Sequence, residues 1–372
     1  MSSNLVLYRK YRPKTFEEII GQPHIVQTLK NAVASDRVAH AYLFSGPRGT
    51  GKTTVARLIA KTLNCENETK KGDSCDACAV CAEFNEGKLI DLIEIDAASN
   101  RGIDEIRELR EMTRFSPTRG KYKTYIVDEV HMLTKEAFNA LLKTLEEPPS
   151  HSIFILATTE FEKVPETIIS RCQHFEFRKI PASEIKNSLE QICRAEGVKI
   201  DDASLHFLAV ASDGSLRDAQ SLLGQIIVGT DAGQSITLPY IRQYFGAPDA
   251  VAVKEFLDAL AEKNPAAALG ILNRLVDAGQ DPDYFAKLII NSLRGHLLAK
   301  FAPAQNIGEY GAAEVAEIKN RGEKFGEGEI ERAIKIFIAA ADEMKISPIP
   351  HLPIELAIIE ITSGSTISPS IK

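Results

Sequence analysis

The feature that most constrains this chain is residues 46–53, which read GPRGTGKT. They match the P-loop pattern, in which a glycine, four free positions and Gly-Lys-Thr follow a buried strand and open a helix. Gly46, Gly49 and Gly51 permit backbone conformations that a Cβ would hinder. Consecutive amides can therefore point at phosphate oxygens at the positive end of a helix dipole. The segment predicts a site for a nucleoside triphosphate.

The flanking sequence supplies the strand and the helix that this motif requires. Residues 41–44 are apolar, and apolar residues recur after the loop at helical spacing: Val55, Leu58, Ile59 and Leu63. In such a site Lys52 reaches the β and γ phosphates and Thr53 holds Mg²⁺. A glycine-rich turn that matches by accident is the alternative, and the strand and helix argue against it. The predicted phosphate-binding set is Gly46, Gly49, Thr50, Gly51, Lys52, Thr53 and Thr54.

Length and composition favour a multidomain protein. The chain has 372 residues, of which 44% are hydrophobic, enough for two or three cores. No apolar stretch approaches the roughly 20 residues that cross a bilayer, and the N-terminal residues become charged too early for a signal-peptide core. We therefore expect a cytoplasmic protein. The net charge of -7 argues against coating of a nucleic acid by bulk electrostatics, so any DNA contact must be local.

A second strand-like run delivers two acids. Residues 122–127 are rich in β-branched and aromatic types, and Asp128 and Glu129 follow directly. Open α/β sheets bind ligands at the carboxyl ends of their strands, which places these acids beside the P-loop. Asp128 suits the Mg²⁺ shell, and Glu129 suits polarising the attacking water. In isolation an Asp-Glu pair is more often a solvated turn, but the P-loop reverses that preference.

A third strand-like run, residues 153–159, ends in two threonines, and residues 170–172 (SRC) follow it. With the P-loop and the DEVH segment, this order resembles the AAA+ ATPases, and SRC resembles their clamp-loader branch. By this resemblance Thr159 is the sensor residue that reads the γ-phosphate, with Thr158 as the neighbouring alternative. Arg171 would be the arginine finger that enters the ATP site of an adjoining subunit. An ordinary surface arginine is the alternative; a finger implies a protein that works only as an oligomer.

Two further segments are similar to nucleotide-contacting parts of the same family. Residues 214–219 (GSLRDA) resemble its sensor-2 motif, in which Arg217 would contact the γ-phosphate from a helical lid. An exposed arginine paired with Asp218 or Asp213 is the alternative.

The N-terminal residues 7–13 (LYRKYRP) and the later Gly21-Gln22 step could form a basic, tyrosine-containing nucleic-acid patch. The clamp-loader resemblance implies another role, in which this segment closes over the adenine and the ribose. Tyr8 and Arg12 are the residues assigned to that edge.

Four of the six cysteines lie close together in the sequence: Cys65, Cys75, Cys78 and Cys81. In a cytosolic chain such clustering indicates a metal rather than disulfides. Four thiolates suit a structural, tetrahedral Zn²⁺ that would help to fold a loop rich in Lys, Asp, Asn and Glu. An iron–sulfur cluster and free thiols are the alternatives, although the run lacks the Cys-Pro of ferredoxin patterns. Cys172 and Cys193 are expected to be ordinary core or surface residues.

This cysteine insert, between the P-loop helix and the next strand, resembles the gamma/tau subunit family of bacterial DNA polymerase III. The resemblance covers essentially the whole chain and implies its organisation. Residues 1–179 would form an α/β AAA+ domain, a P-loop parallel sheet with helices on both faces and the zinc module at 65–81. A helical lid over 180–243 and an all-α collar over 244–372 would follow, the collar serving oligomerisation. Collar helices are expected at 251–262, 265–278, 283–301, 314–321, 329–345 and 354–361.

Residues 99–102 (SNRG) precede a helix expected over 103–115, whose N-terminus could meet a DNA phosphate. In clamp loaders the equivalent surface faces the primer-template. From the residues alone, Asn100 is equally a helix cap.

The leading hypothesis is the ATPase motor subunit of a bacterial sliding-clamp loader, part of the DNA polymerase III holoenzyme, with ATP, Mg²⁺ and Zn²⁺ as cofactors. ATP binding would open the clamp and allow primer-template DNA to bind, and hydrolysis would release the loaded clamp. The implied partners are δ- and δ′-type subunits and further copies of this chain in a pentamer, the sliding clamp and DNA. The alternatives are an AAA+ branch-migration helicase and a non-catalytic clamp-loader scaffold.

Overall fold

The computed structural model describes residues 6–67, 72–231, 233–246, 250–301, 324–326 and 328–363. The chain divides into two compact units, Met1–Ile236 and Thr237–Lys372. In the described part of the chain, no helix combines the length and apolar character that crossing a bilayer requires.

The first unit is built around a five-stranded parallel sheet with the strand order β2-β3-β4-β1-β5. Its central strands are continuously apolar and almost fully buried, as expected for a sheet covered on both faces. The carboxyl ends of all the strands lie at one edge, so the loops after β1, β3 and β4 meet there. The strands are β1 (Ala41–Ser45), β2 (Leu92–Asp96), β3 (Lys123–Asp128), β4 (Ser152–Thr158) and β5 (Gln173–Glu176).

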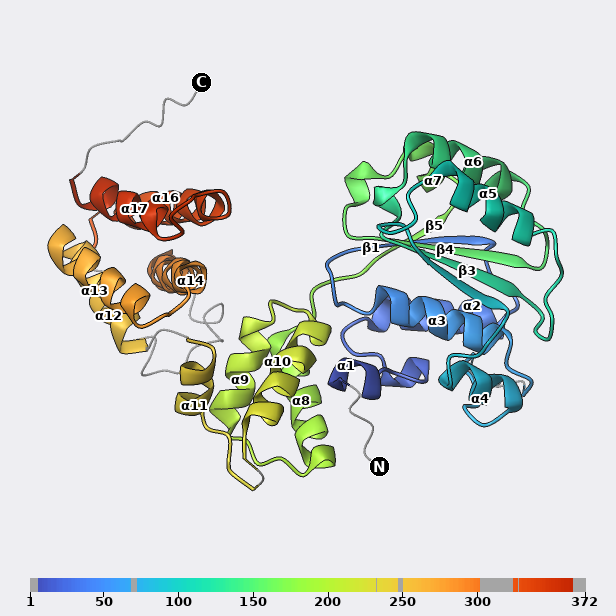
Figure 1. Cartoon of the computed structure of the whole chain (residues 1–372), viewed down its shortest axis with the longest axis horizontal. Coiled ribbons are helices and arrows are strands. Elements are labelled where there is room, and N and C mark those ends of the chain that lie inside the picture. The colour runs from blue at the N-terminus through green and yellow to red at the C-terminus, as the bar shows by residue number, and fades with distance from the viewer. Residues whose placement is uncertain are drawn as a thin grey trace. The chain divides into compact units, whose positions relative to one another are not determined.

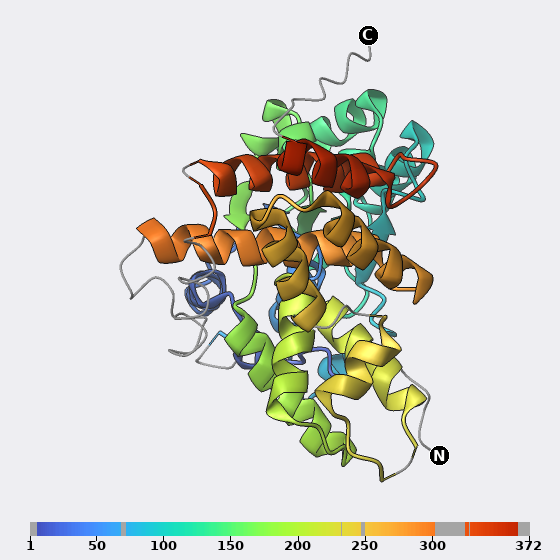
Figure 2. The same ribbon diagram turned by 90° about the vertical axis from the view of Figure 1, so that its left-hand side faces the viewer.

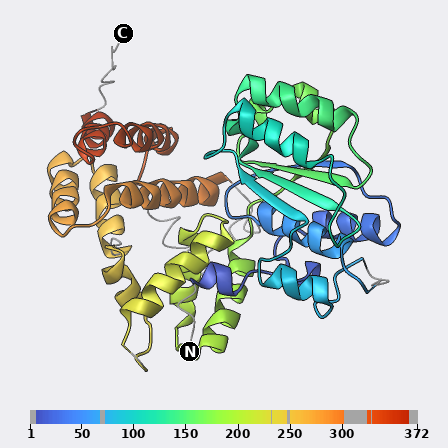
Figure 3. The same ribbon diagram turned by 45° about the vertical axis from the view of Figure 1, so that its right-hand side comes forward.

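Helices cover both faces of this sheet (Figures 1 and 3). On one face, α2 (Pro23–Ala34) and α3 (Lys52–Leu63) pack against the side chains of Tyr42 and Phe44. Alternate residues of the same strand, Ala41 and Leu43, face a second core. The helices of that core are α5 (Ile103–Met112), α6 (Lys135–Glu146) and α7 (Glu166–Ile169). The expected α/β P-loop sheet with helices on both faces is therefore confirmed.

Shorter elements and a helical group complete the first unit. The N-terminal α1 (Leu7–Lys10) packs against α10 (Leu216–Gly229), and α4 (Ala79–Asn85) belongs to the cysteine insert. The helical group consists of α8 (Ala182–Glu196), α9 (Asp202–Ala211) and α10 (Leu216–Gly229). Among the described residues, the 3₁₀ turn η1 (Phe16–Glu18) lies between α1 and α2, while η2 (Val130–Met132) follows β3 and η3 (Phe161–Lys163) follows β4.

All elements described in the second unit are helices, as predicted. α14 (Pro282–Phe301) packs against α16 (Glu329–Met344), and α16 packs against α17 (Leu352–Ser363) (Figure 2). The core of this unit contains buried aromatic side chains. The helix expected at 314–321 lies outside the described residues. The helices are α11 (Leu238–Tyr244), α12 (Ala250–Ala261), α13 (Pro265–Asp277), α14 (Pro282–Phe301), α16 (Glu329–Met344) and α17 (Leu352–Ser363).

α5 begins at Ile103, as predicted, but its N-cap and its end differ from the prediction. Its N-cap is Gly102, without a side-chain cap, so the interpretation of Asn100 as the cap is wrong. The Asn100 side chain instead donates to the carbonyl oxygen of Asp96 at 2.9 Å and closes the turn after β2. The helix ends at Met112 rather than at Phe115, whose side chain is exposed and adds nothing to the core.

Candidate functional site: a nucleotide pocket and a cysteine cluster

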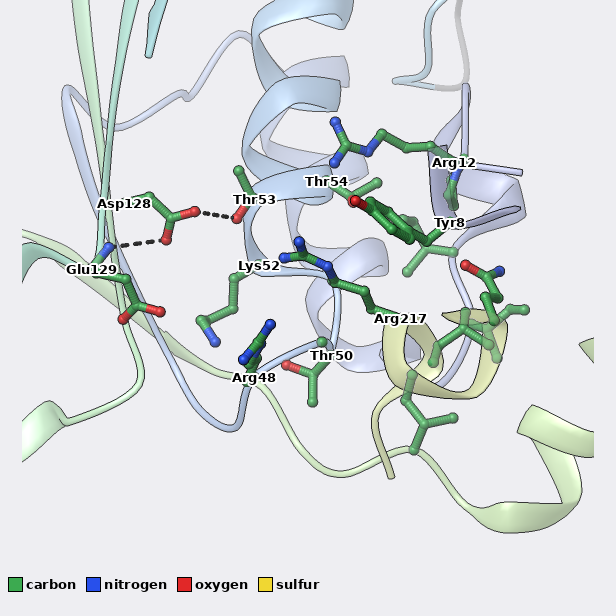
Figure 4. A pocket seen from close by; sticks show the side chains of 18 of the residues that line it. Tyr8, Arg12, Arg48, Thr50, Lys52, Thr53, Thr54, Asp128, Glu129 and Arg217 are labelled. Carbon is green, nitrogen blue, oxygen red and sulfur yellow. Dashed lines mark hydrogen bonds between the residues drawn. The ribbon is translucent and has the colours of Figure 1, made fainter. Parts of the chain in front are cut away.

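A cavity of about 690 Å³ lies at the carboxyl edge of the sheet, between the P-loop, the N-terminal segment and the first turn of α10. Figure 4 shows the two acids at one end of it and Tyr8 and Arg12 at the other. Most of the residues predicted to bind nucleotide line this single space: Tyr8, Arg12, Gly49, Thr50, Gly51, Lys52, Thr53, Thr54, Asp128, Glu129 and Arg217.

Backbone conformation favours glycine at all three P-loop positions, and packing also requires it at Gly46 and Gly49. The φ angles of Gly46, Gly49 and Gly51 are 131°, 74° and 104°, in the region that side chains disfavour. A Cβ on Gly46 would lie 2.2 Å from the carbonyl oxygen of Phe177, and one on Gly49 would lie 1.9 Å from Oγ of Ser215. A Cβ on Gly51 would meet nothing within 4 Å. The loop is thus seated against the end of the sheet and against α10, while Gly51 faces open space.

Lys52 is buried at the floor of the cavity with its charge directed at the loop. Its Nζ donates to the carbonyl oxygens of Gly46 at 2.7 Å and Pro47 at 2.8 Å. Burial lowers the pKa of Lys52, and the nearby Glu129 and Asp128 only partly oppose that shift. A buried ammonium held by two neutral carbonyls is well suited to donate hydrogen bonds to phosphate oxygens.

Thr53 and Asp128 form the oxygen pair expected of a magnesium site. Thr53 Oγ1 donates to Asp128 Oδ2 at 2.7 Å, and the other carboxylate oxygen accepts the amide of Glu129 at 3.0 Å (Figure 4). Hydroxyl and carboxylate oxygens from two different elements meet here, and these are the ligand types that Mg²⁺ takes in phosphate sites.

Glu129 stands at the centre of a polar cluster. Its backbone is left-handed, with φ 48° and ψ 45°, a costly conformation for a residue with a side chain. Its Oε2 accepts a hydrogen bond from Thr159 Oγ1 at 2.9 Å. The neighbouring Thr158 is fully buried and lies 3.0 Å from Nδ1 of His131, whose other nitrogen lies 3.2 Å from Glu160. Of the two threonines considered for the sensor position, Thr159 is therefore the one in contact with the acid.

Arg217 lies against the N-terminal segment. Its guanidinium carbon is 4.8 Å from the centre of the Tyr8 ring, and its hydrogen bond to Tyr8 lowers the pKa of that phenol. The alternative was an ion pair of Arg217 with Asp218 or Asp213, and of these two carboxylates Asp213 pairs with Lys179 instead, at 2.7 Å.

Several lining residues were not identified from the sequence. Arg48 occupies a free position of the P-loop motif, and Gln220 follows Arg217 by one helical turn, a spacing that could have identified it. Four apolar residues also line the cavity: Ile19, Ile20, Ile180 and Leu216. No sequence motif identified them, because they come from separate loops and from α10.

Arg171 does not line this cavity. Its guanidinium donates to Glu146 Oε1 at 2.6 Å and to the carbonyl oxygen of Thr167 at 2.7 Å. These contacts hold the side chain, one-third exposed, on the α6–α7 side of the unit. Arg171 is therefore separated from the pocket of its own chain.

The four clustered cysteines come together in space. Their sulfur atoms all lie within 4.8 Å of one another, with Cys65–Cys78, Cys75–Cys81 and Cys65–Cys81 separations of 3.9, 4.0 and 3.8 Å. Sulfurs bound at about 2.3 Å to one tetrahedral zinc would be about 3.8 Å apart. Backbone amides of Cys75, Cys78 and Cys81 each donate to the sulfur of another member. The donor set and its spacing fit a closed four-thiolate zinc site.

The remaining two cysteines lie apart from this cluster. Burial raises the pKa of Cys172 to about 12 and that of Cys193 to about 11. Both are thiols with little nucleophilic character at neutral pH.

Family models match nearly all of the chain. The model described as DNA polymerase III, delta subunit, matches residues 21–181. The clamp loader subunit, ATPase lid domain, matches 184–232, and DNA polymerase III subunits gamma and tau domain III matches 236–372.

Two DNA polymerase III subunits give the same family. DNA polymerase III subunit tau of Bacillus subtilis is 42% identical over 363 residues, 96% of this chain and 63% of that protein. The gamma subunit of Buchnera aphidicola is 35% identical over 96% of this chain and 99% of its own length. A solved Thermotoga maritima RuvB structure, a Holliday junction branch migration motor, covers 73% of this chain and 86% of its own at 19% identity and TM-score 0.48. The chain spans less than two thirds of the Bacillus protein, and it belongs to the gamma/tau subunit family of DNA polymerase III.

Proposed function

We propose that this chain is the ATPase motor subunit of a bacterial sliding-clamp loader and acts in the cytoplasm. The observation that carries the proposal is the convergence of Lys52, the Thr53–Asp128 pair and Glu129 on one cavity, with Thr159 bonded to the Glu129 carboxylate. These are the groups that phosphoryl transfer needs, because the protein mainly positions the reactants and neutralises charge.

In this proposal the triphosphate of ATP lies along the P-loop amides, with Lys52 and Arg217 on its β and γ phosphates. Thr53 and Asp128 would hold Mg²⁺, which neutralises charge on the phosphates when it is bound. Glu129 polarises the attacking water, and Thr159 orients the Glu129 carboxylate through their hydrogen bond. The adenine and ribose lie towards the Tyr8 and Arg12 end of the cavity.

Arg171 acts in trans. Its distance from the cavity of its own chain and its partly exposed guanidinium support a role in the site of an adjoining subunit. The exchange of its Glu146 contact for a phosphate contact would then couple hydrolysis to assembly. Bound ATP stabilises one assembly state over another only through such differential contacts.

The proposed partners are δ- and δ′-type subunits, further copies of this chain, the sliding clamp and primer-template DNA. We assign the ATPase domain to residues 1–179, the lid to 180–243 and the oligomerising collar to 244–372. The four cysteines would bind a structural Zn²⁺. The family relatives named as polymerase III subunits support this assignment over a branch-migration helicase.

The test is the ATPase rate of a loader reconstituted with δ-type subunits, clamp and primer-template. We expect clamp and DNA to stimulate hydrolysis. Arg171→Ala should lower the hydrolysis rate by a factor of at least about a thousand. Arg194→Ala is the matched control, since Arg194 makes only an exposed contact to Glu190. A wild-type rate in the Arg171→Ala complex would remove the finger assignment, and unwinding of DNA without a clamp would favour a helicase.

A further inference from the structure

The N-terminal segment, defined here as residues 7–16, supplies one wall of the nucleotide cavity through Tyr8, Arg12 and Pro13. In its middle, at Lys10 and Tyr11, the segment is held by Glu196 on α8. Oε1 of Glu196 accepts hydrogen bonds from Lys10 Nζ at 2.6 Å and from the Tyr11 hydroxyl at 2.5 Å. The C-terminal end of the segment, at Lys14 and Phe16, reaches the cysteine insert and the side chain of Lys61.

Asp73 ties the insert to the far end of this segment. Both of its carboxylate oxygens accept from the amide of Phe16, at 3.1 and 2.9 Å, and both residues are buried. Asp73 lies two positions before the ligand Cys75. The conformation of the cysteine loop therefore places the carboxylate that satisfies a buried amide of the N-terminal segment.

Lys61 makes a second tie. Its side chain is completely buried on α3, the helix that the P-loop opens, and Nζ donates to the carbonyl oxygen of Lys14 at 2.9 Å. Nζ also donates to Asp76 at 2.5 Å and Asn85 at 3.1 Å. Asp76 lies inside the Cys75–Cys78 knuckle, with a left-handed φ of 53°. One ammonium thus joins the N-terminal segment, the P-loop helix and the cysteine knuckle.

These ties depend on the folded state of the insert. A buried ammonium and a buried carboxylate are stable only while their hydrogen-bond partners stay in place. The insert is polar and small, so four sulfur ligands on one metal are the interaction best able to fix its loop.

We propose that the cysteine insert is a metal-dependent brace for the nucleotide pocket, with Asp73 and Lys61 as positioning residues that act through the N-terminal segment. This inference rests on the proposed nucleotide and zinc sites. Its consequence is that metal binding sets the affinity for ATP without entering the chemistry of hydrolysis.

The test uses the full chain with two substitutions of the carboxylate, Asp73→Ala and Asp73→Asn. Lys88→Ala is the matched control on the same insert, because it removes an exposed contact to Glu86. For Asp73→Ala we expect zinc content by metal analysis to be unchanged and the Kd for ATP to rise about five- to tenfold. The kcat at saturating ATP should stay within about twofold. Hydrogen exchange in residues 7–13 should accelerate. Asp73→Asn keeps one acceptor oxygen and should restore most of the affinity.

Removal of zinc by a chelator should raise the Kd for ATP and accelerate exchange of residues 7–13 in the same way. Unchanged affinity and unchanged exchange, in Asp73→Ala or in metal-free protein, would overturn the brace. That failure is distinct from failure of the underlying sites. Absence of zinc from wild-type protein would refute the zinc site, and ATP binding by Lys52→Ala at wild-type affinity would refute the nucleotide site.

Discussion

Glu129 shows how much of the site depends on single residues. Its backbone is left-handed, and its carboxylate accepts a hydrogen bond from Thr159. The carboxylate of the adjacent Asp128 instead accepts one from Thr53, so the two neighbouring acids have different surroundings. The sequence predicted both acids and both threonines. Only the structure assigned one threonine to His131 and the other to Glu129, because side-chain direction at the end of a strand depends on the turn that follows.

Glu129→Gln should bind ATP with near wild-type affinity and lose about a hundredfold to ten-thousandfold of its hydrolysis rate, since an amide cannot take a proton. Equilibrium binding of ATP and single-turnover hydrolysis measure the two effects separately. Thr159→Ser is the control, because it keeps the hydroxyl. A Glu129→Gln enzyme that hydrolyses ATP normally would show that another group activates water.

The buried Lys52 predicts a specific pH dependence. Because burial lowers the pKa of Lys52 below 10.5, the ammonium loses its proton at a lower pH than an exposed lysine, and ATP affinity should fall over that alkaline range. In the same range the nucleotide-free folded state binds fewer protons than the unfolded state, so this group makes the free energy of unfolding rise with pH. Lys52→Arg, which stays charged, should show a flat affinity profile in the same titration.

At the scale of elements, the P-loop and α10 are fitted to each other. Ser215 caps α10 by accepting the amide of Asp218 at 3.2 Å, and the same hydroxyl packs against Gly49. Gly49 occupies a free position of the P-loop motif, and the sequence analysis assigned it to the phosphate-binding set. Its contact with the lid helix could not be predicted, because more than 160 residues separate the two in the sequence.

Gly49→Ala should therefore weaken ATP binding and lower the melting temperature. The new Cβ would collide with Ser215, and the alanine would have to adopt the positive φ of Gly49. Differential scanning fluorimetry with and without ATP measures both effects. Gly270→Ala is the matched control, because Gly270 lies inside α13 with open space around its Cβ position. Alanine there should raise the free energy of unfolding by about 0.5–1 kcal/mol. Equal stability of the two variants would contradict the steric argument.

At the scale of the whole molecule, Arg171 lies outside the cavity of its own chain, so the proposed catalytic site is incomplete in one subunit. The described helices of the second unit have a hydrophobic core of their own, which includes Phe256, Phe285 and Phe337. The periodicity of the sequence predicted these helices, since each buries one apolar face.

Mixing inactive variants tests the shared site. Lys52→Ala and Arg171→Ala should each be inactive as the only form of this chain in the loader. A loader assembled from both should recover a measurable part of the clamp- and DNA-stimulated ATPase rate, because a Lys52→Ala subunit can lend Arg171 to a neighbour with an intact P-loop. No recovery in verified mixed complexes would place the action of Arg171 within its own chain.

The sequence by itself determined the parts of this protein that local chemistry encodes: the P-loop and its helix, the acid pair after a buried strand, the four-cysteine insert and the run of amphipathic helices. Each rests on residue type and short spacing, which a linear pattern carries. Tertiary structure decided the contacts between distant segments. It turned Thr159 to Glu129, placed Arg217 over Tyr8, kept Arg171 away from its own pocket and joined the cysteine insert to the N-terminal segment through Lys61. Those contacts depend on how the sheet order brings loops together, which no short pattern specifies.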